Sequence, residues 1–570
     1  MKKTVSFLLL LLFFSMAATS PTGRIPVYAK NGMVVSASMV ASEVGRDILK
    51  KGGNAIDAAV ATAFALAVTW PTAGNIGGGG FIVYVDKQGK ATSIDFREKA
   101  PLAAHEKMFL DKEGNVIKDL NHAGLLSVGV PGTVAGLHLA HSKYGRLPWA
   151  TLVDPAVQLA SKGFPFTHAL HQQTENLKEE VENYPSTKKV IYKNGGELYE
   201  MNEKWKQPDL AATLKRIKKY GRDGFYKGEV AEKLEAFMKA NGGLITRQDL
   251  EQYQAVERKP LMGTYKGYTL YSMPPPSSGG VALLEMLSIL EGFDLDTLGY
   301  KSADYVHVIT ETMRRAFADR AEFLGDPDFN PELPVDKLIS KERAAQLRSS
   351  IDMAKASPSD SSKFGQLYDG GNNTTHLSVV DKEGNAVSLT YTLEQSYGCK
   401  VVAEGLGFFL NDEMGDFNPQ PGITTRSGQI GSRPNLIAPG KRMLSSMTPT
   451  IVLKDGKPVL VVGSPGGRTI INTVLQVFLN YAEHDMNIAQ AVEMPRMHHQ
   501  WLPDKLYFEH FSIAPEVQKI LKSRGHTLIE LPVGAVSFPG HAMSIAIDPV
   551  TGFRMGAADS RGADGGAAGY

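Results

Sequence analysis

The chain has 570 residues, of which 43% are apolar and 21% are charged, so it is long enough to bury a large hydrophobic core. Its formal net charge is +1, which does not indicate a partner such as nucleic acid or an anionic membrane. The only cysteine is Cys399, so no internal disulfide is expected.

Residues 1–20 predict a signal peptide. Lys2 and Lys3 precede the apolar run 7–14, and small residues follow it. The run is too short to span a bilayer, and no other segment is long and apolar enough, so we expect no membrane anchor. Export would deliver the protein to the periplasm, the favoured compartment, or to the outside of the cell.

The first third of the chain predicts helices around one strand. An amphipathic helix is expected over 35–51, and a second helix over 55–68 is apolar nearly all round and therefore buried, with Asn54 as its cap. Glycines 77–80 then lead into a strand over 81–85. Tight backbone packing explains these glycines better than a phosphate loop, because phosphate loops run from strand to glycines to helix.

The middle of the chain is mostly helical by pattern. Residues 150–260 read as charged helices whose basic residues form a solvated face. A strand is expected over 263–272, and helices over 281–290 and 303–323. Residues 350–372 are rich in Ser, Asp and Gly and predict an exposed, mobile linker.

Strands dominate the last third. Besides a hairpin directly after the linker, the patterns predict strands over 506–510, 543–547 and 553–557, and helices over 471–484 and 515–523. The predicted elements have helices at both ends of the chain order and strands between them, which indicates a layered α/β architecture. Composition does not give the order of the layers.

The most informative segment begins at Asn373, where a polar, Gly-rich stretch runs into two threonines and a strand. A threonine is a weak nucleophile unless a base takes its proton. Cleavage just before it would supply its own α-amine, whose reference pKa is about 8, as that base. We therefore interpret Asn373-Thr374 as a self-cleavage site and Thr374 as the nucleophile, with Thr375 as the alternative.

The hairpin suggests a partner for this threonine. A turn cluster over 381–385 separates the two strands. If all five residues form the loop, Val380 faces Ala386 and Thr374 lies opposite Thr392, whose hydroxyl would hold the first. A four-residue loop would shift the pairing by one residue.

Three other sequence features suggest chemistry but fit it poorly. Ser127 and Ser464 resemble nucleophile elbows, yet both lack the first glycine, and Pro465 disfavours the turn into a helix. His498 and His499 are adjacent, so their side chains diverge, and no carboxylate at metal-ligand spacing accompanies them. We expect structural roles for all of these residues.

A series of segments carries a family resemblance over about 31–570. In chain order they are NGMVVSASMVASEVGRDILKKGGNAIDAAVATAFAL, GNIGGGGFIVY, DFREKAP, VGVPGTVAGL, MPPPSSGG, TTHLSVVDKEGNAVSLTYTLEQSYG, LNDEMGDF, MLSSMTPT, GSPGG and MPRMHHQWLPD. In these segments and their order the chain resembles the γ-glutamyltransferases, members of the N-terminal nucleophile hydrolases. The resemblance implies a four-layer αββα sandwich. A large fragment, 21–373, and a small catalytic fragment, 374–570, would build it jointly and stay together as a heterodimer.

The resemblance also implies roles for individual residues. They are Thr374 as nucleophile, Thr392 as its support, Arg97, Ser445 and Ser446 at the substrate α-carboxylate, Glu394, Glu413 and Asp416 at its α-ammonium, and the backbone amides of Gly466 and Gly467 as the oxyanion hole. Physical chemistry agrees with this assignment. A carboxylate is well matched by the fork of donors of an arginine, an ammonium needs acidic groups, and closely approaching amides stabilise an oxyanion.

The expected activity is therefore an exported γ-glutamyltransferase and glutathione hydrolase. It would pass the γ-glutamyl group of glutathione and related compounds to water, or to amino-acid or dipeptide acceptors, without a metal or organic cofactor. Stretch 421–441 resembles the lid loop of many bacterial members, but Ser427 stands where an aromatic residue often closes the pocket. The balance between hydrolysis and transfer therefore stays open.

Two alternatives use the same nucleophile and one does not. A β-lactam side-chain acylase or a poly-γ-glutamate transpeptidase would share the machinery and differ in the acyl group. Arg97 together with Ser445 and Ser446 favours free γ-glutamyl substrates. An exported binding protein without chemistry is the alternative of another class, and it would keep the chain uncut.

Overall fold

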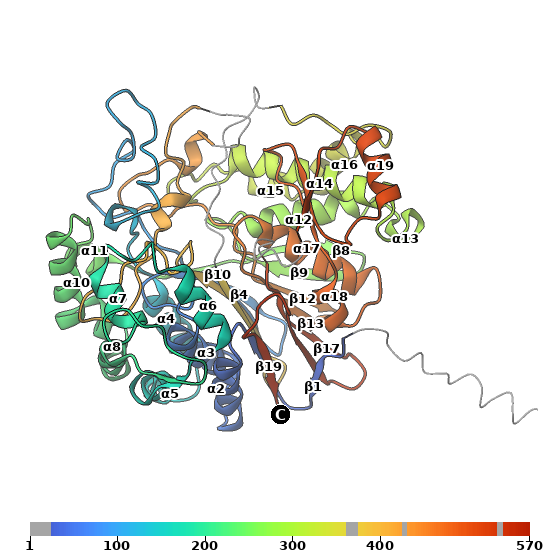
Figure 1. Ribbon diagram of the computed structural model, residues 1–570. Helices are drawn as coiled ribbons and strands as arrows, with labels where there is room; N and C mark the ends of the chain where they lie inside the picture. The colour runs from blue at the N-terminus through green and yellow to red at the C-terminus, as the bar shows by residue number, and fades with distance from the viewer. Residues whose placement is uncertain (1–23, 361–373, 424–429, 533–539) are drawn as a thin grey trace, which may run out of the picture.

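The computed structural model describes residues 24–360, 374–423, 430–532 and 540–570, and two large antiparallel sheets form its centre (Figure 1). The first sheet contains, in spatial order, β1 (Val27–Ala29), β18 (Arg554–Ala558), β17 (Met543–Ile547), β13 (Lys457–Val462), β12 (Thr450–Lys454), β9 (Tyr268–Ser272) and β8 (Leu261–Tyr265). The second contains β19 (Gly566–Gly569), β2 (Met33–Ser36), β10 (Thr374–Val380), β11 (Ala386–Thr392), β3 (Gly79–Val85), β4 (Ala91–Phe96) and β7 (Val256–Arg258). The predicted signal peptide, Asn373 and Ser427 lie outside the described residues.

The two sheets pack face to face, and helices cover both outer faces. Strand β10 contacts β17, and β11 contacts β12 and β13 across the interface. Helices α2 (Met39–Lys50), α3 (Ala55–Thr69) and α4 (Thr133–Tyr144) cover the second sheet, and α12 (Gly279–Leu290), α17 (Thr469–Ala482) and α18 (Ile488–Glu493) cover the first (Figure 1). The expected four-layer αββα sandwich is confirmed.

The remaining elements surround this sandwich. One group of helices follows α4: α5 (Trp149–Lys162), α6 (His168–Asn176), α7 (Pro185–Ile191), α8 (Pro208–Tyr220), α9 (Asp223–Tyr226), α10 (Gly228–Ala240) and α11 (Arg247–Gln252). Another group lies with α12: α13 (Leu295–Leu298), α14 (Ala303–Phe323), α15 (Val335–Leu338), α16 (Lys341–Ser349) and α19 (Pro515–Ser523). The short elements are η1 (Leu125–Ser127), η2 (Glu413–Asp416), η3 (Arg433–Asn435), β5 (Phe164–Pro165), β6 (Lys204–Trp205), β14 (Met497–His498), β15 (Leu506–Glu509) and β16 (Leu528–Leu531).

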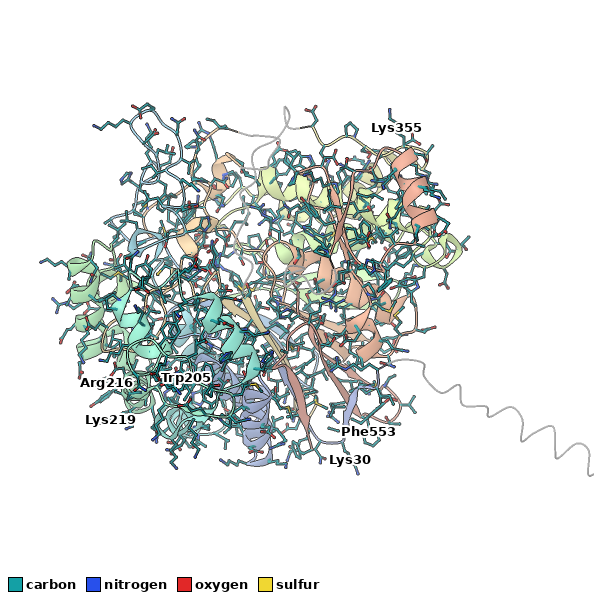
Figure 2. All side chains as sticks on the ribbon, in the orientation of Figure 1. Lys30, Trp205, Arg216, Lys219, Lys355 and Phe553 are labelled. Atoms are coloured by element: carbon teal, nitrogen blue, oxygen red, sulfur yellow. The ribbon has the colours of Figure 1, made fainter. Side chains whose placement is uncertain are left out.

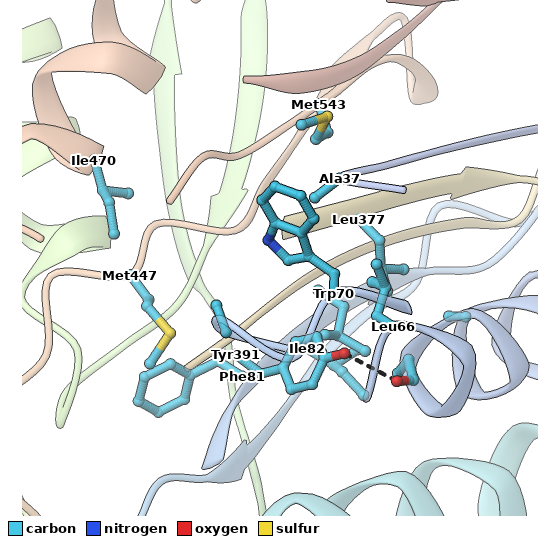
Figure 3. Close-up of a cluster of buried hydrophobic side chains, with 14 of the residues drawn as sticks. Ala37, Leu66, Trp70, Phe81, Ile82, Leu377, Tyr391, Met447, Ile470 and Met543 are labelled. Carbon is cyan, nitrogen blue, oxygen red and sulfur yellow. Dashed lines mark hydrogen bonds between the residues drawn. The ribbon is translucent and has the colours of Figure 1, made fainter. Parts of the chain in front are cut away.

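The apolar core fills the space between the layers. Leu377 and Tyr391 of the second sheet, Met543 of the first sheet and Trp70 at the end of α3 pack together there, all nearly inaccessible to solvent (Figure 3). The Tyr391 hydroxyl donates to the backbone oxygen of Ala63 at 2.9 Å, which joins β11 to α3. Burial of this kind is the main favourable term that holds the four layers together.

The predicted buried helix over 55–68 is confirmed as α3. Asn54 caps α3 through a capping box with Asp57, and every residue of α3 is buried. Arg216 and Lys219 of α8 lie at the periphery of the molecule, as expected for a solvated face (Figure 2). No helix among the described residues is long and apolar enough to cross a membrane.

Two predicted elements are wrong in extent. Residues 35 and 36, expected to begin a helix, belong to strand β2, because residues 33–36 pair with β10 and β19, a long-range contact that overrides the helical pattern; the helix begins at Met39. The single strand expected over 263–272 is a hairpin of β8 and β9. Lys266 and Gly267 form its turn with φ of 42° and 85°, as in the two-residue turns that join antiparallel strands.

Glycines 77–80 pack tightly, as predicted. A Cβ on Gly78 would lie 2.0 Å from the backbone oxygen of Thr392, and one on Gly80 would lie 2.3 Å from that of Thr390. These glycines therefore let β3 approach the end of β11, which carries the site described next.

Candidate active site

Thr374 is the first residue of β10 and lies opposite Thr392, the last residue of β11, as the five-residue loop predicts. The loop keeps this register because the Asp381 carboxylate accepts hydrogen bonds from the backbone N–H groups of Glu383 and Asn385 at 2.9 and 3.0 Å. The two threonine hydroxyls lie 3.2 Å apart, and Thr374 is 5% exposed. The Thr392 hydroxyl also accepts from the N–H of Glu394 at 2.8 Å, which fixes its position.

A single pocket brings nearly all the predicted site residues together around Thr374. Its walls contain nine of the ten candidates, and the tenth, Gly466, directly precedes Gly467 of the wall. The lining residues are Arg97, Arg320, Thr374, Thr392, Glu394, Glu413, Asp416, Ser445, Ser446, Met447, Gly467, Arg468 and Ile470. Segments from both predicted fragments therefore form one site.

Arg97 follows β4 and is completely buried at the centre of a charged cluster. Its guanidinium lies 2.5 Å from the Glu413 carboxylate and 3.3 Å from that of Glu98, and it also pairs with Asp416. Burial alone would lower the pKa of Arg97, but the carboxylates, Glu413 first, raise it above its ordinary value. The arginine expected at one end of the substrate thus contacts the acids expected at the other end.

Burial affects the acids in the opposite direction. It raises the pKa of Glu413 well above its ordinary value and that of Glu98 to about 8, although Arg97 opposes both shifts. Removing Arg97 would take away the charge that opposes these shifts, so both pKa values would rise further.

The serine pair follows the charged cluster along the same wall. The Ser445 hydroxyl accepts from the backbone N–H of Met447 at 3.1 Å, and the Ser446 hydroxyl accepts from the guanidinium of Arg320 at 2.9 Å. In both cases the hydroxyl oxygen is held by a donor, so its own hydrogen is directed elsewhere. This arrangement suits two donors for an incoming carboxylate.

Gly466 and Gly467 precede α17 with φ of 131° and 53°, conformations that favour glycine. The carbonyl of Gly466 accepts from the N–H of Thr469 at 3.1 Å, which begins the first helical turn. The N-terminus of a helix carries partial positive charge from its N–H groups. An anion that develops beside Thr374 would therefore be stabilised at this corner of the pocket.

Sequence reasoning missed three charged residues at this site. Arg320 and Arg468 line the pocket, and His122 lies 3.1 Å from Glu394. Burial would lower the pKa of His122, but the Glu394 carboxylate raises it to about 9. Arg468 directly follows the predicted glycine pair, whereas Arg320 and His122 lie in segments without a predicted site residue, so no local spacing signals those two.

The His122 pair also explains a cluster with the composition of a metal site. His122, Glu394 and Asp412 place ligand atoms within 4.8 Å of one another. At neutral pH the raised pKa keeps His122 as an imidazolium, both of whose nitrogens are donors and neither a metal ligand. We therefore interpret His122 and Glu394 as an ion pair in which the imidazolium balances the charge of the Glu394 carboxylate.

The rejected candidates have structural contacts. Ser127 donates to the backbone oxygen of Gly124 at 2.7 Å, and Ser464 donates to that of Pro465 at 2.7 Å. His498 contacts Asn472 at 2.7 Å, and burial lowers its pKa to about 4. None of these side chains is among those that line the Thr374 pocket.

Comparison with known proteins agrees with this geometry. The family model described as Gamma-glutamyltranspeptidase matches residues 41–570. A glutathione hydrolase proenzyme of Pseudomonas sp. (strain A14) is 50% identical over 500 residues, which cover 88% of this chain and 87% of that protein.

Two solved structures extend the comparison. A cephalosporin acylase from Bacillus halodurans superposes with a TM-score of 0.85 at 28% identity, covering 97% of this chain and 98% of that chain. A chain of the Helicobacter pylori gamma-glutamyltranspeptidase superposes with a TM-score of 0.56 at 45% identity, covering 59% of this chain and 95% of that chain.

Proposed function

The chain belongs to the gamma-glutamyltranspeptidase family, and from that premise we propose that it is an exported glutathione hydrolase and γ-glutamyltransferase made as a precursor. The observation that carries the proposal is the pocket itself. It holds a threonine at the start of a strand together with an arginine, acids and a serine pair that match the two charged ends of a γ-glutamyl group.

Maturation comes first. The Thr374 hydroxyl attacks the carbonyl carbon of Asn373, the acyl group shifts from nitrogen to oxygen, and water hydrolyses the resulting ester. The chain then consists of fragments 21–373 and 374–570, which stay together because β10 lies between β2 and β11 in one sheet. The solved Helicobacter pylori chain, which matches only 59% of this chain, supports a two-chain mature form.

Catalysis uses the new amino terminus. The α-amine of Thr374 takes the proton of its hydroxyl, which attacks the γ-carbonyl of the donor. The amides of Gly466 and Gly467 stabilise the oxyanion, and losing one such donor typically costs about 2.7–4 kcal/mol of transition-state stabilisation. Collapse expels the leaving amine and leaves a γ-glutamyl ester, which passes to water or to the amine of an amino acid or dipeptide.

Substrate binding replaces internal contacts with external ones. The α-carboxylate meets Arg97, Ser445 and Ser446, and the α-ammonium meets the acids. In the structure Arg97 already pairs with Glu413 and Asp416. A zwitterionic substrate would enter between them, with its carboxylate on the arginine and its ammonium on the acids. The chemistry needs no metal or organic cofactor.

Donor selectivity tests this proposal against the acylase alternative. The processed enzyme should release glutamate from glutathione. It should remove the glutaryl side chain of a cephalosporin, which lacks the α-amine, at least about a hundredfold more slowly in kcat/KM, because the buried acids would lose their partner. Thr374→Ala serves as the inactive control for both donors. Faster turnover of the cephalosporin would establish the acylase activity instead, for which the Bacillus halodurans structure is the precedent.

A further inference from the structure

Arg320 is a buried cation in the Thr374 pocket to which neither the sequence motifs nor the proposed mechanism gives a task. It lies near the C-terminal end of α14, is 7% exposed, and lines the pocket beside the serine pair. It also lines an adjoining cavity that shares Asp416 and Arg468 with the first.

The contacts of Arg320 all lead to the serine pair. Its Nε donates to the Ser278 hydroxyl at 2.8 Å, and its Nη2 donates to the Ser446 hydroxyl at 2.9 Å. The Ser278 hydroxyl in turn donates to the backbone oxygen of Ser445 at 2.6 Å. One guanidinium therefore holds Ser446 directly and Ser445 through one intermediate residue.

The charge of Arg320 has no carboxylate partner within ion-pair distance among the described residues. Asp416 is the acid that acts on it most, and that carboxylate pairs with Arg97. Burial and the neighbouring Arg468 guanidinium lower the pKa of Arg320. A buried cation without a partner is unfavourable, and an anion placed beside it removes that penalty.

The proton count at Ser446 shows where such an anion would bind. A guanidinium only donates, so the Ser446 oxygen is the acceptor in its contact with Arg320. The single hydroxyl hydrogen of Ser446 is then directed away from Arg320. A carboxylate at this place receives that hydrogen bond from a hydroxyl that the cation polarises.

We propose that Arg320 is a positioning residue for recognition of the substrate α-carboxylate, acting through Ser446 and the segment that carries it. The inference rests on the proposed γ-glutamyl specificity and deepens it. Arg97 contacts the carboxylate directly, and Arg320 orients the Ser446 hydroxyl that donates to it.

The test compares two donors in the same variants. One is γ-glutamyl-p-nitroanilide, and the other is the same compound with its α-carboxylate converted to the α-carboxamide. The readout is the ratio of kcat/KM for the acid to kcat/KM for the amide, which a general loss of folded enzyme does not change. The variants are Arg320→Gln, Ser446→Ala and the double substitution.

We expect Arg320→Gln to lower this ratio about tenfold to a hundredfold, mainly through KM for the acid, as for the loss of a hydrogen bond to a charged group. The double variant should fall no further than Ser446→Ala alone, because both changes remove the same oriented donor. Arg343→Gln is the matched control. Its guanidinium pairs with Asp319, the neighbour of Arg320, and does not line the pocket, so the ratio should not change.

Equal losses on the two donors in Arg320→Gln, or additive losses in the double variant, would overturn the proposal. If Arg320→Gln does not fold, Arg320→Lys takes its place in the same cycle. Lysine keeps the charge but cannot reach both serines with a fixed fork, so the ratio should still fall. A wild-type enzyme that turns over neither donor would instead refute the proposed function.

Discussion

Replacing Arg97 by glutamine removes a guanidinium that pairs with three carboxylates, those of Glu98, Glu413 and Asp416. The substitution has two separable effects. One concerns substrate affinity, because Arg97 is the proposed ligand of the α-carboxylate. The other concerns the stability of the fold, because two of the three acids are completely buried.

The effect on affinity follows from the hydrogen bonds that are lost. A hydrogen bond to a charged group contributes about 1.5–3 kcal/mol, so KM for a γ-glutamyl anilide should rise about tenfold to a hundredfold. The chemical step should change less, since neither Thr374 nor the oxyanion site contacts Arg97 through any hydrogen bond described above.

The effect on stability depends on pH. Glu98 has a reference pKa of 4.5, and burial raises it to about 8 in the folded protein even though Arg97 opposes the shift. A carboxyl group whose pKa is raised by folding stabilises the fold fully below its unfolded pKa and loses that contribution as pH rises through its folded pKa. Without Arg97 the folded pKa lies higher still, so the loss continues above pH 8.

The Tm of Arg97→Gln should therefore lie close to that of the wild type at pH 5 and well below it at pH 8–9. Breaking a buried ion pair costs about 3–5 kcal/mol, which is the upper limit expected at the alkaline end. Adding Glu413→Gln removes one of the stranded acids, so it should recover part of the Tm at pH 8 and none of the affinity. A KM within about threefold of the wild type, or a Tm difference independent of pH, would refute this reasoning.

Three further substitutions probe the rest of the pocket. Asp416→Asn should raise KM for γ-glutamyl anilide about tenfold or more but leave the turnover of glutaryl anilide, which has no α-amine, unchanged. Equal losses of kcat/KM on the two anilides would show that Asp416 does not bind the α-ammonium. Thr392→Val should slow both self-cleavage and turnover, because it removes the support of Thr374 and leaves the Glu394 N–H without its acceptor; cleavage at the wild-type rate would contradict this. His122→Gln should lower Tm most near pH 6 and hardly at all near pH 10. The folded protein raises the pKa of His122 to about 9, so its ion pair with Glu394 is lost as pH rises through that value. A Tm difference that stays constant with pH in calorimetric scans would count against this ion pair.

The sequence was sufficient for the nucleophile hairpin because its register depends on local features. The turn residues between 381 and 385 set the loop length, and the period of two then places Thr374 opposite Thr392. The buried helix α3 was equally clear, since Asn54 and an apolar run are both local signals. The order of the layers came from the family resemblance.

Other features depend on contacts that no local pattern encodes. Residues 33–36 form a strand only because β10 and β19 lie beside them. Arg320 belongs to a helix that the sequence predicts over 303–323, but its place in the pocket follows from how α14 packs near the serine pair. His122 likewise gains its role only when Glu394, far along the chain, is brought beside it.

The central claim is that Thr374 cuts the chain and then serves as the nucleophile. The most direct measurement is the intact mass and amino-terminal sequence of the purified wild-type protein and of Thr374→Ala. The account predicts two wild-type fragments, the smaller beginning at Thr374, and one uncut chain in the variant. An uncut wild-type chain, or efficient cleavage in Thr374→Ala, would contradict it.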